Sequence, residues 1–384
     1  MMAFLSEVIA RQKSHAVDVV SLDDFTLGPS RAVAPELVLT SPDWSLYSVD
    51  IGKGLAMFVE LPPGTDLAAA AFVYMAQFDQ AIRAVVMPID LLEPLSQQVV
   101  MPETLGILFS TGRCGSTLAS RILAHVPGVW SLSEPDVLNN LAFARFQLPQ
   151  DRMVPLIATV MRLLCRPPAG RDIRTIVIKP RSESMIHAPD FALALPGSRN
   201  VFMYRDAEGF TNSLYQFAQK MIGQETFFGS ADAWQIGWPF TAVNAPLDLL
   251  DDYFPDDRAG VGFTEIMLLA WVLRMDAYLA ALDHGIRMQP LHYHDLNSRR
   301  REETARLLGA FGISADQIDL AMRGFENDSQ SGTGGDRALP ARPLDDGQSR
   351  RIYALLARWG KPDYRAERLP IGRGGHRKTK RPLG

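Results

Sequence analysis

From Thr104 onward, short apolar runs alternate with longer stretches of helical periodicity. The short runs predict strands at residues 105–110, 175–180, 200–205 and 290–296. The stretches between them predict helices at residues 117–126, 150–165, 208–222 and 264–283. Short strands that alternate with helices are typical of a parallel sheet covered on both faces. We therefore predict an α/β fold with three layers and a central parallel sheet.

The first hundred residues follow another pattern. Two strand-like runs, WSLYSVDIG and GLAMFVELP, meet at Lys53 between two glycines, which suits a tight hairpin. Residues 66–85 are rich in alanine and spaced apolar residues, and they predict a helix that Asp66 caps. We expect a small α+β element at 1–100 and the main domain at 101–384. Three roles stay open for this element: shaping a ligand pocket, dimerisation or recognition of a partner.

Composition narrows the class of protein. The 384 residues are 47% hydrophobic and 21% charged, which supports a sizeable core and argues against gross disorder. A net charge of −4 gives no reason to expect a nucleic-acid partner, although the tail from Gly372 is basic. Two cysteines make no disulfide framework. With no signal peptide and no spanning segment in the pattern, we expect a cytoplasmic protein.

The stretch ILFSTGRCGSTLASRIL joins the first of these strands to a helix through a glycine-containing loop. Such a loop turns backbone N–H groups and a helix N-terminus toward an anion. It lacks the lysine of G-x-x-x-x-G-K-[ST], and no acidic strand end is evident to hold magnesium. The stretch predicts an anion site without a metal; an ordinary strand-to-helix turn is the alternative.

Three polar segments, FSTGRCGST, IKPRS and MYRD, follow predicted strands. In open parallel sheets, ligands bind outside the carboxyl ends of the strands. We therefore expect these segments to meet at one site.

These segments resemble the motifs of sulfotransferases that use 3′-phosphoadenosine 5′-phosphosulfate (PAPS). RCGSTLASRIL is similar to their 5′-phosphosulfate motif, with Cys114 where serine is common. VFMYRDAEGFTNSLYQF is similar to their 3′-phosphate motif, in which Arg205 and Ser213 match in type and spacing. PLHYHDLNSRRREETARLLGAFGI resembles a third run late in these enzymes. The resemblance spans residues 104–315 and implies a P-loop NTPase-like fold and PAPS as sulfuryl donor.

The resemblance also implies roles for individual residues. Lys179 and Arg113 would stabilise the leaving group, while Arg205 and Ser213 would bind the 3′-phosphate. The alternatives are an ion pair of Arg205 with Asp206 and, for Lys179, a strand-end lysine that extends its head into water. The residues expected to hold the 5′-phosphosulfate are Gly112, Arg113, Cys114, Gly115, Ser116 and Thr117.

The general base is expected to be Glu134. Many cytosolic members of the family carry histidine two residues beyond the strand-end lysine, where this chain has Arg181, which cannot act as a base at neutral pH. The chain looks more like the protein-tyrosine sulfotransferase branch, in which a glutamate follows the loop helix. Glu134 falls at the matching place. The alternative is that Ser133, Glu134 and Pro135 start a helix.

The acceptor and the assembly are not specified by the motifs. The acceptor is a hydroxyl or amine of a small molecule, glycan or peptide; no nucleic acid and no membrane span are expected, and homodimer formation stays open. Residues 227–240 line the acceptor pocket or belong to the core. His292 and His294 are expected on one strand face, without the third ligand that zinc needs. A nucleotide-dependent kinase and a non-catalytic binding protein on the same scaffold remain the two rival functions.

Overall fold

The computed structural model describes residues 2–15, 17–224, 227, 249–255, 261–326, 340–364 and 369–371. Most of the aromatic run at 227–240 and all of the basic tail from Gly372 therefore lie outside the described residues. The strands are β1 (Ala3–Arg11), β2 (Phe25–Leu27), β3 (Arg31–Val33), β4 (Trp44–Asp50), β5 (Leu55–Glu60), β6 (Arg83–Pro88), β7 (Thr104–Ser110), β8 (Val129–Ser133), β9 (Thr175–Lys179), β10 (Arg199–Tyr204) and β11 (Gln289–His292).

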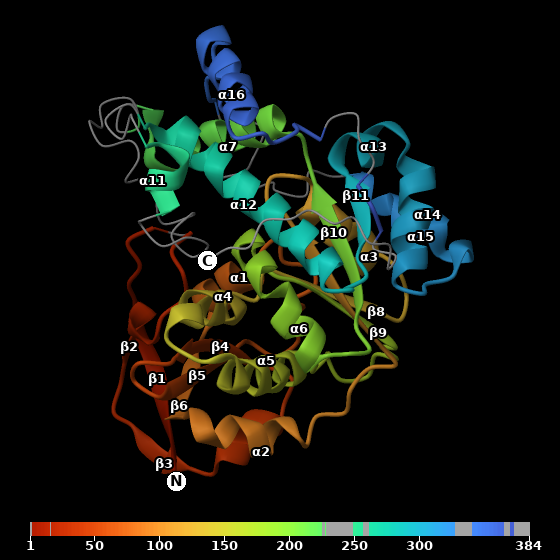
Figure 1. The fold of residues 1–384 in the computed structure, drawn as a ribbon. Helices are drawn as coiled ribbons and strands as arrows, with labels where there is room; N and C mark the ends of the chain where they lie inside the picture. The colour runs from red at the N-terminus through yellow and green to blue at the C-terminus, as the bar shows by residue number, and fades with distance from the viewer. Residues whose placement is uncertain are drawn as a thin grey trace.

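From β7 onward helices alternate with strands, and further helices follow the last strand, β11 (Figure 1). They are α1 (Val73–Gln80), α2 (Leu92–Ser96), α3 (Ser116–Ala124), α4 (Val137–Phe143), α5 (Gln150–Leu164), α6 (Ala188–Ala194), α7 (Ala207–Ile222), α11 (Leu249–Tyr253), α12 (Phe263–Asp283), α13 (Tyr293–Ser298), α14 (Arg300–Ala310), α15 (Ile318–Ala321) and α16 (Asp346–Arg358).

The central sheet has five strands in the order β11-β10-β7-β9-β8, and every pairing is parallel. On one face lie α3, α14 and α15, whose core includes Ile122, Leu308 and Phe311. On the other face α6 and α12 pack against the strands, where Phe202 stacks on Tyr278 at 4.2 Å between ring centroids. The predicted three-layer α/β fold with a central parallel sheet is confirmed.

One strand of this sheet was not predicted. β8 forms an edge and pairs with β9, so that Ser133 lies opposite Lys179. All five residues of β8 are buried, with Trp130 and Leu132 alternating with serines. Such a short run directly after Pro127-Gly128 gives little periodicity to detect.

The N-terminal residues form a second, antiparallel sheet in the order β2-β1-β6-β5-β4, with β3 paired to β1. The predicted hairpin is confirmed as β4 and β5. The predicted helix at 66–85 is wrong at both ends. Asp66 accepts from Ala68 N–H in a turn, α1 begins only at Val73, and residues from Arg83 form β6. Pairing on both sides, with β5 and β1, outweighs the helical propensity of the alanines.

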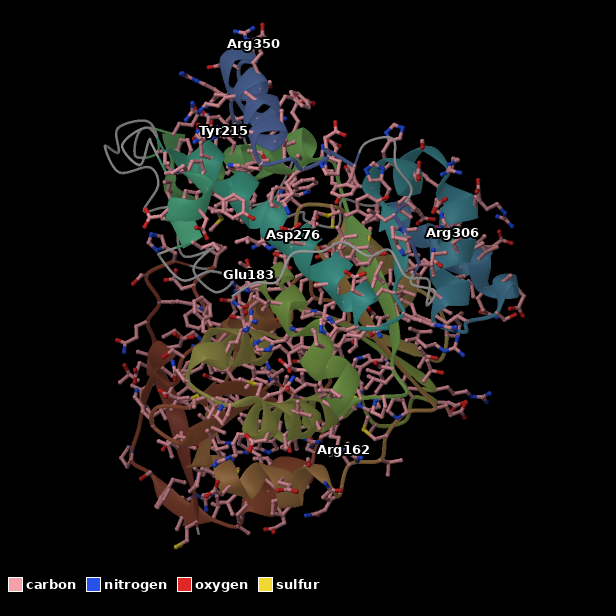
Figure 2. All side chains as sticks on the ribbon, viewed as in Figure 1. Arg162, Glu183, Tyr215, Asp276, Arg306 and Arg350 are labelled. Atoms are coloured by element: carbon pink, nitrogen blue, oxygen red, sulfur yellow. The ribbon has the colours of Figure 1, made fainter. Side chains whose placement is uncertain are left out.

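The two sheets share one hydrophobic core, which Figure 2 shows filled with side chains. Phe58 of β5 and Trp130 of β8 belong to the same buried cluster, and α4 and α5 pack against β4. The N-terminal sheet is thereby held close to the carboxyl end of β8. The division of the chain at residue 100 stays a prediction.

Candidate active site

The glycine loop after β7 has the backbone expected of an anion cradle. Gly112 and Gly115 have φ values of +83° and +79°, and α3 begins at the next residue, Ser116. A Cβ at Gly115 would lie 2.8 Å from the Tyr293 ring, and one at Gly112 would lie 2.9 Å from Ser182 Oγ. Glycine is therefore required here for both conformation and space. It also leaves the N-terminus of α3 without a side-chain cap, so its N–H groups are available to a ligand.

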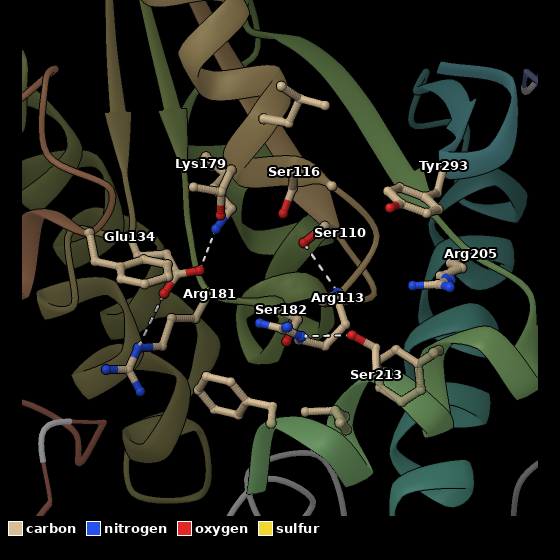
Figure 3. A pocket seen from close by; sticks show the side chains of 18 of the residues that line it. Ser110, Arg113, Ser116, Glu134, Lys179, Arg181, Ser182, Arg205, Ser213 and Tyr293 are labelled. Carbon is tan, nitrogen blue, oxygen red and sulfur yellow. Dashed lines mark hydrogen bonds and ion pairs between the residues drawn. The ribbon is translucent and has the colours of Figure 1, made fainter. Parts of the chain in front are cut away.

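The three predicted segments line one cavity of about 770 Å³ at the carboxyl ends of the strands. Figure 3 shows side chains from the loop, the end of β9 and α7 directed into it. Of the predicted site residues, Cys114 alone does not line the cavity: it is fully buried beneath the loop, and its Sγ lies 3.3 Å from the Met203 carbonyl oxygen. Its backbone remains part of the loop.

Arg113 connects the two predicted phosphate sites. Its Nε donates to Ser213 Oγ of α7 at 3.1 Å, and its guanidinium carbon lies 4.7 Å from the centroid of the Phe217 ring. Burial lowers the pKa of Arg113 to about 10, while Glu134 opposes this shift. Arg113 therefore remains a cation at neutral pH. Its planar fork of N–H donors suits an oxyanion, such as a carboxylate, phosphate or sulfate, that can accept two hydrogen bonds from it.

Arg205, which directly follows β10, faces the cavity from the side opposite Lys179 and Glu134 (Figure 3). Its guanidinium carbon lies 4.6 Å from the centroid of the Tyr293 ring. The alternative ion pair with Asp206 is not formed: Asp206 caps α7 by accepting from Gly209 N–H at 2.7 Å. In the described part of the chain no carboxylate lies within ion-pair distance of Arg205. Its charge is therefore available to an anion.

Lys179 and Glu134 meet at the edge where β8 and β9 end. Lys179 Nζ donates to Glu134 Oε1, and Glu134 N–H donates to the Lys179 carbonyl at 2.7 Å. The Lys179 side chain is 2% exposed, so it does not extend its head into water. Glu134 has a φ of 57° and lies before α4, which begins at Val137; the helix-start alternative is therefore wrong.

Sequence reasoning missed the ion pairs around this edge. Arg181 Nε lies 2.7 Å from Asp136 Oδ1 and 3.9 Å from Glu134 Oε2. Arg274 of α12 forms a second buried pair with Glu183, at 2.9 Å. The position of Arg181 two residues after Lys179 was a usable signal, whereas nothing in the pattern marks Asp136 or Arg274.

The N-terminal element supplies another wall of the cavity. Val17, Phe72, Tyr74 and Met75 line it, and Tyr74 stacks under Arg181 at 4.2 Å from ring centroid to guanidinium carbon. Phe217 of α7 lines the cavity as well. Arg113 and Arg205 line one part of the cavity, and these apolar and aromatic side chains of the N-terminal element line another part, beside Arg181.

The described residues meet neither the requirements of a metal site nor those of a membrane-spanning helix. His292 ends β11 and His294 lies in α13, so the expectation that they share a strand face is wrong. No cluster of three or more His, Cys, Asp or Glu side chains suited to a metal occurs among the described residues. Within the same residues, no helix combines the length and apolar character needed to cross a bilayer.

Several solved structures are similar to the chain, among them the following three, whereas no family model and no curated protein sequence matches it. The sulfotransferase domain from the curacin biosynthetic pathway is 13% identical, covering 68% of this chain and 99% of its own, with a TM-score of 0.36. Mouse sulfotransferase SULT7A1 complexed with PAP is 11% identical, covering 70% and 88%, with a TM-score of 0.37. Retinol dehydratase in complex with androsterone and the inactive cofactor PAP is 14% identical, covering 71% and 84%, with a TM-score of 0.37.

Proposed function

We propose that this protein is a PAPS-dependent sulfotransferase that transfers a sulfuryl group to a hydroxyl or amine. The observation that carries the proposal is the meeting of three separate segments around one cavity: the glycine loop, the Lys179–Glu134 pair and the Arg205–Ser213 pair. Each segment has the chemistry that one part of a nucleotide phosphosulfate requires. The cytoplasm is the proposed location, supported by two buried cysteines that are not disulfide-bonded.

The basic part of the cavity fits a 3′,5′-bisphosphorylated nucleoside. The uncapped N-terminus of α3 and the loop N–H groups would hold the 5′ group. Arg205 and Ser213 would hold the 3′-phosphate, for which Arg205 has no competing carboxylate among the described residues. The hydrogen bond from Arg113 to Ser213 indicates that both phosphate sites are within reach of one side chain.

The Lys179–Glu134 pair would carry the chemistry. PAPS supplies the sulfuryl group: its bond from sulfur to the 5′-phosphate oxygen breaks as a bond from sulfur to the acceptor oxygen forms. Lys179 and Arg113 would stabilise the charge that develops on the leaving oxygen. Glu134 Oε would accept the proton of the acceptor hydroxyl. Lys179 has three N–H donors, so it can serve both Glu134 and the leaving oxygen.

The first experiment is thermal unfolding with 3′-phosphoadenosine 5′-phosphate (PAP) and, separately, with Mg-ATP. At ~100 times its dissociation constant a ligand adds about 2.7 kcal/mol of stability, which corresponds to a rise of several degrees. A shift with PAP alone supports the proposal. A shift with Mg-ATP alone would favour a kinase, and a shift with neither would contradict the nucleotide site.

The second experiment measures PAP release from PAPS in the presence of a phenol, an aliphatic alcohol, a sugar, a tyrosine peptide and an aryl amine. Turnover with at least one of them is expected. PAP binding without turnover on any of these acceptors would favour a non-catalytic binding protein on the same scaffold.

A further inference from the structure

A buried ion pair connects the N-terminal element to the candidate base. Asp136, at the N-cap position of α4, has a side chain that is 0% exposed, and Arg181 has one that is 11% exposed. Asp136 Oδ1 lies 2.7 Å from Arg181 Nε, and the same nitrogen lies 3.9 Å from Glu134 Oε2. Arg181 therefore stands between two carboxylates, one fully buried and one in the cavity.

Both members of this pair also hold the segment that precedes β2. Asp136 Oδ2 accepts from Val20 N–H at 2.9 Å, and Arg181 Nη1 donates to the Val17 carbonyl at 2.8 Å. The Val20 carbonyl accepts from Asn140 Nδ2 at 2.8 Å. Asn140 lies one helical turn after Asp136, so two side chains of α4 satisfy both backbone groups of one residue.

The contacts of Arg181 leave it little freedom. Its guanidinium lies over the Tyr74 ring, pairs with Asp136 and donates to Val17. A planar cation held by a carboxylate, an aromatic face and a carbonyl is restricted to one orientation. The nitrogen that lies beside Glu134 is Nε, the same one that pairs with Asp136. Lys179 Nζ thus donates to one oxygen of Glu134, and Arg181 Nε lies 3.9 Å from the other.

From this arrangement we infer that Asp136 is a positioning residue for the candidate base: it fixes Arg181 beside Glu134, and through Arg181 it makes residues 17–20 and Tyr74 part of the catalytic unit. The inference rests on the proposed sulfuryl transfer. It also gives the N-terminal element a role, since Val17 and Tyr74 contribute both to the cavity wall and to the fixation of Arg181.

A set of three variants separates positioning from folding. Asp136→Asn keeps an oxygen for Val20 N–H but removes the charge that holds Arg181. Asp136→Asn combined with Arg181→Met removes both charges and leaves no buried cation unpaired, which recovers stability at many buried ion pairs. Asn140→Ala loosens the same segment without touching Arg181. Full-length protein is used throughout, with PAP affinity, melting temperature and PAPS turnover on the best acceptor of the panel as readouts.

The expected results differ among the variants. Asp136→Asn should lower kcat by about 10- to 100-fold, the effect of misplacing a catalytic group by about an ångström, with PAP affinity within twofold of wild type. The double variant should regain melting temperature but not kcat. Asn140→Ala should speed hydrogen exchange at residues 17–20 and cost less kcat than Asp136→Asn.

Recovery of both melting temperature and kcat in the double variant would overturn the inference, because the pair would then be only structural. Equal losses of kcat in Asn140→Ala and Asp136→Asn would overturn it as well. A wild-type protein that neither binds PAP nor turns over PAPS contradicts the proposed function itself, and the inference falls with it. The measurement of PAP binding to the wild-type protein thus distinguishes failure of the inference about Asp136 from failure of the proposed function.

Discussion

Arg113 and Ser213, one hundred positions apart in the chain, are joined by a hydrogen bond of 3.1 Å from Nε to Oγ. The bond connects the loop after β7 to the middle of α7. The motifs assign the loop to the 5′-phosphosulfate and α7 to the 3′-phosphate. The cavity is thus organised around a cation that a bound anion would have to share with Ser213.

Replacing Arg205 with Met should weaken PAP binding by about 10- to 100-fold, equivalent to ~1.4–2.7 kcal/mol, the range for hydrogen bonds to charged groups. Because Arg205 has no ion pair among the described residues, the melting temperature without ligand should hardly change. Isothermal titration with PAP measures the first effect. Arg301→Met, which removes an exposed ion pair with Asp319, is the control. Unchanged PAP affinity in Arg205→Met would exclude the assigned 3′-phosphate site.

Replacing Glu134 with Gln should lower kcat by about 10²- to 10⁴-fold, the usual contribution of a general base. PAP affinity should stay within twofold, since the Glu134 carboxylate lies across the cavity from Arg205, which is assigned to the 3′-phosphate (Figure 3). Initial rates at saturating PAPS and acceptor measure the effect. Glu326→Gln, which changes another acid that lines the cavity, serves as the matched control. If Glu134→Gln retained full activity on a hydroxyl acceptor, the base would have to be another group.

Replacing Gly115 with Ala should lower stability and abolish PAP binding, because the new Cβ would lie 2.8 Å from the Tyr293 ring at a φ of +79°. The left-handed backbone alone costs roughly 1–2 kcal/mol for a non-glycine residue. Gly64→Ala isolates that part, since Gly64 has a φ of +82° and nothing within 4 Å of its Cβ position. Urea unfolding of both variants should show the larger loss at Gly115; equal losses would mean that Tyr293 moves aside freely.

Stability should depend on pH through Asp136. Burial raises the pKa of this carboxyl to about 6 from 3.8, against the opposing effect of Arg181. Between about pH 4 and 6 the native state therefore binds more protons than the unfolded state, and the free energy of unfolding falls as pH rises through this window. The expected fall is on the order of 1–3 kcal/mol. Asp136→Asn should lack this slope and Asp172→Asn, at an exposed acid, should keep it. A rise in stability across the window in wild type would contradict the shift.

Of the four strands after β6 that the pattern predicts, three have clear apolar runs, and the fourth, β11, does not. β7, β9 and β10 each carry a run of apolar residues, ILF, IVI and VFMY, because strands buried on both faces need no polar alternation. β8 escapes notice because two of its five residues are serines and it follows a helix end directly. β6 is not predicted because the alanine-rich stretch that runs into it favours a helix until the pairing partners are known.

Only those residues of the candidate site that lie in the motifs or at the matching place can be predicted from the sequence. Arg113, Lys179, Arg205 and Ser213 are found because each stands at a fixed distance from a strand end. Asp136, by contrast, acquires its position from a contact with Val20, which no local pattern anticipates. Tertiary contacts of this kind depend on how the second sheet docks, and this docking is set by packing rather than by local sequence.

The contacts of α4 also constrain how the chain can be assembled. Val20 is separated from Asp136 by 116 positions, and Val17 is separated from Arg181 by 164. During synthesis the N-terminal sheet emerges first, yet the side chains that satisfy residues 17–20 are made much later. One face of the N-terminal sheet therefore stays uncovered until those residues are made, and the large sequence separation of these contacts slows folding. Expression of residues 1–100 alone should yield an aggregation-prone product, and slower translation between β6 and β9 should prolong the exposure of that face.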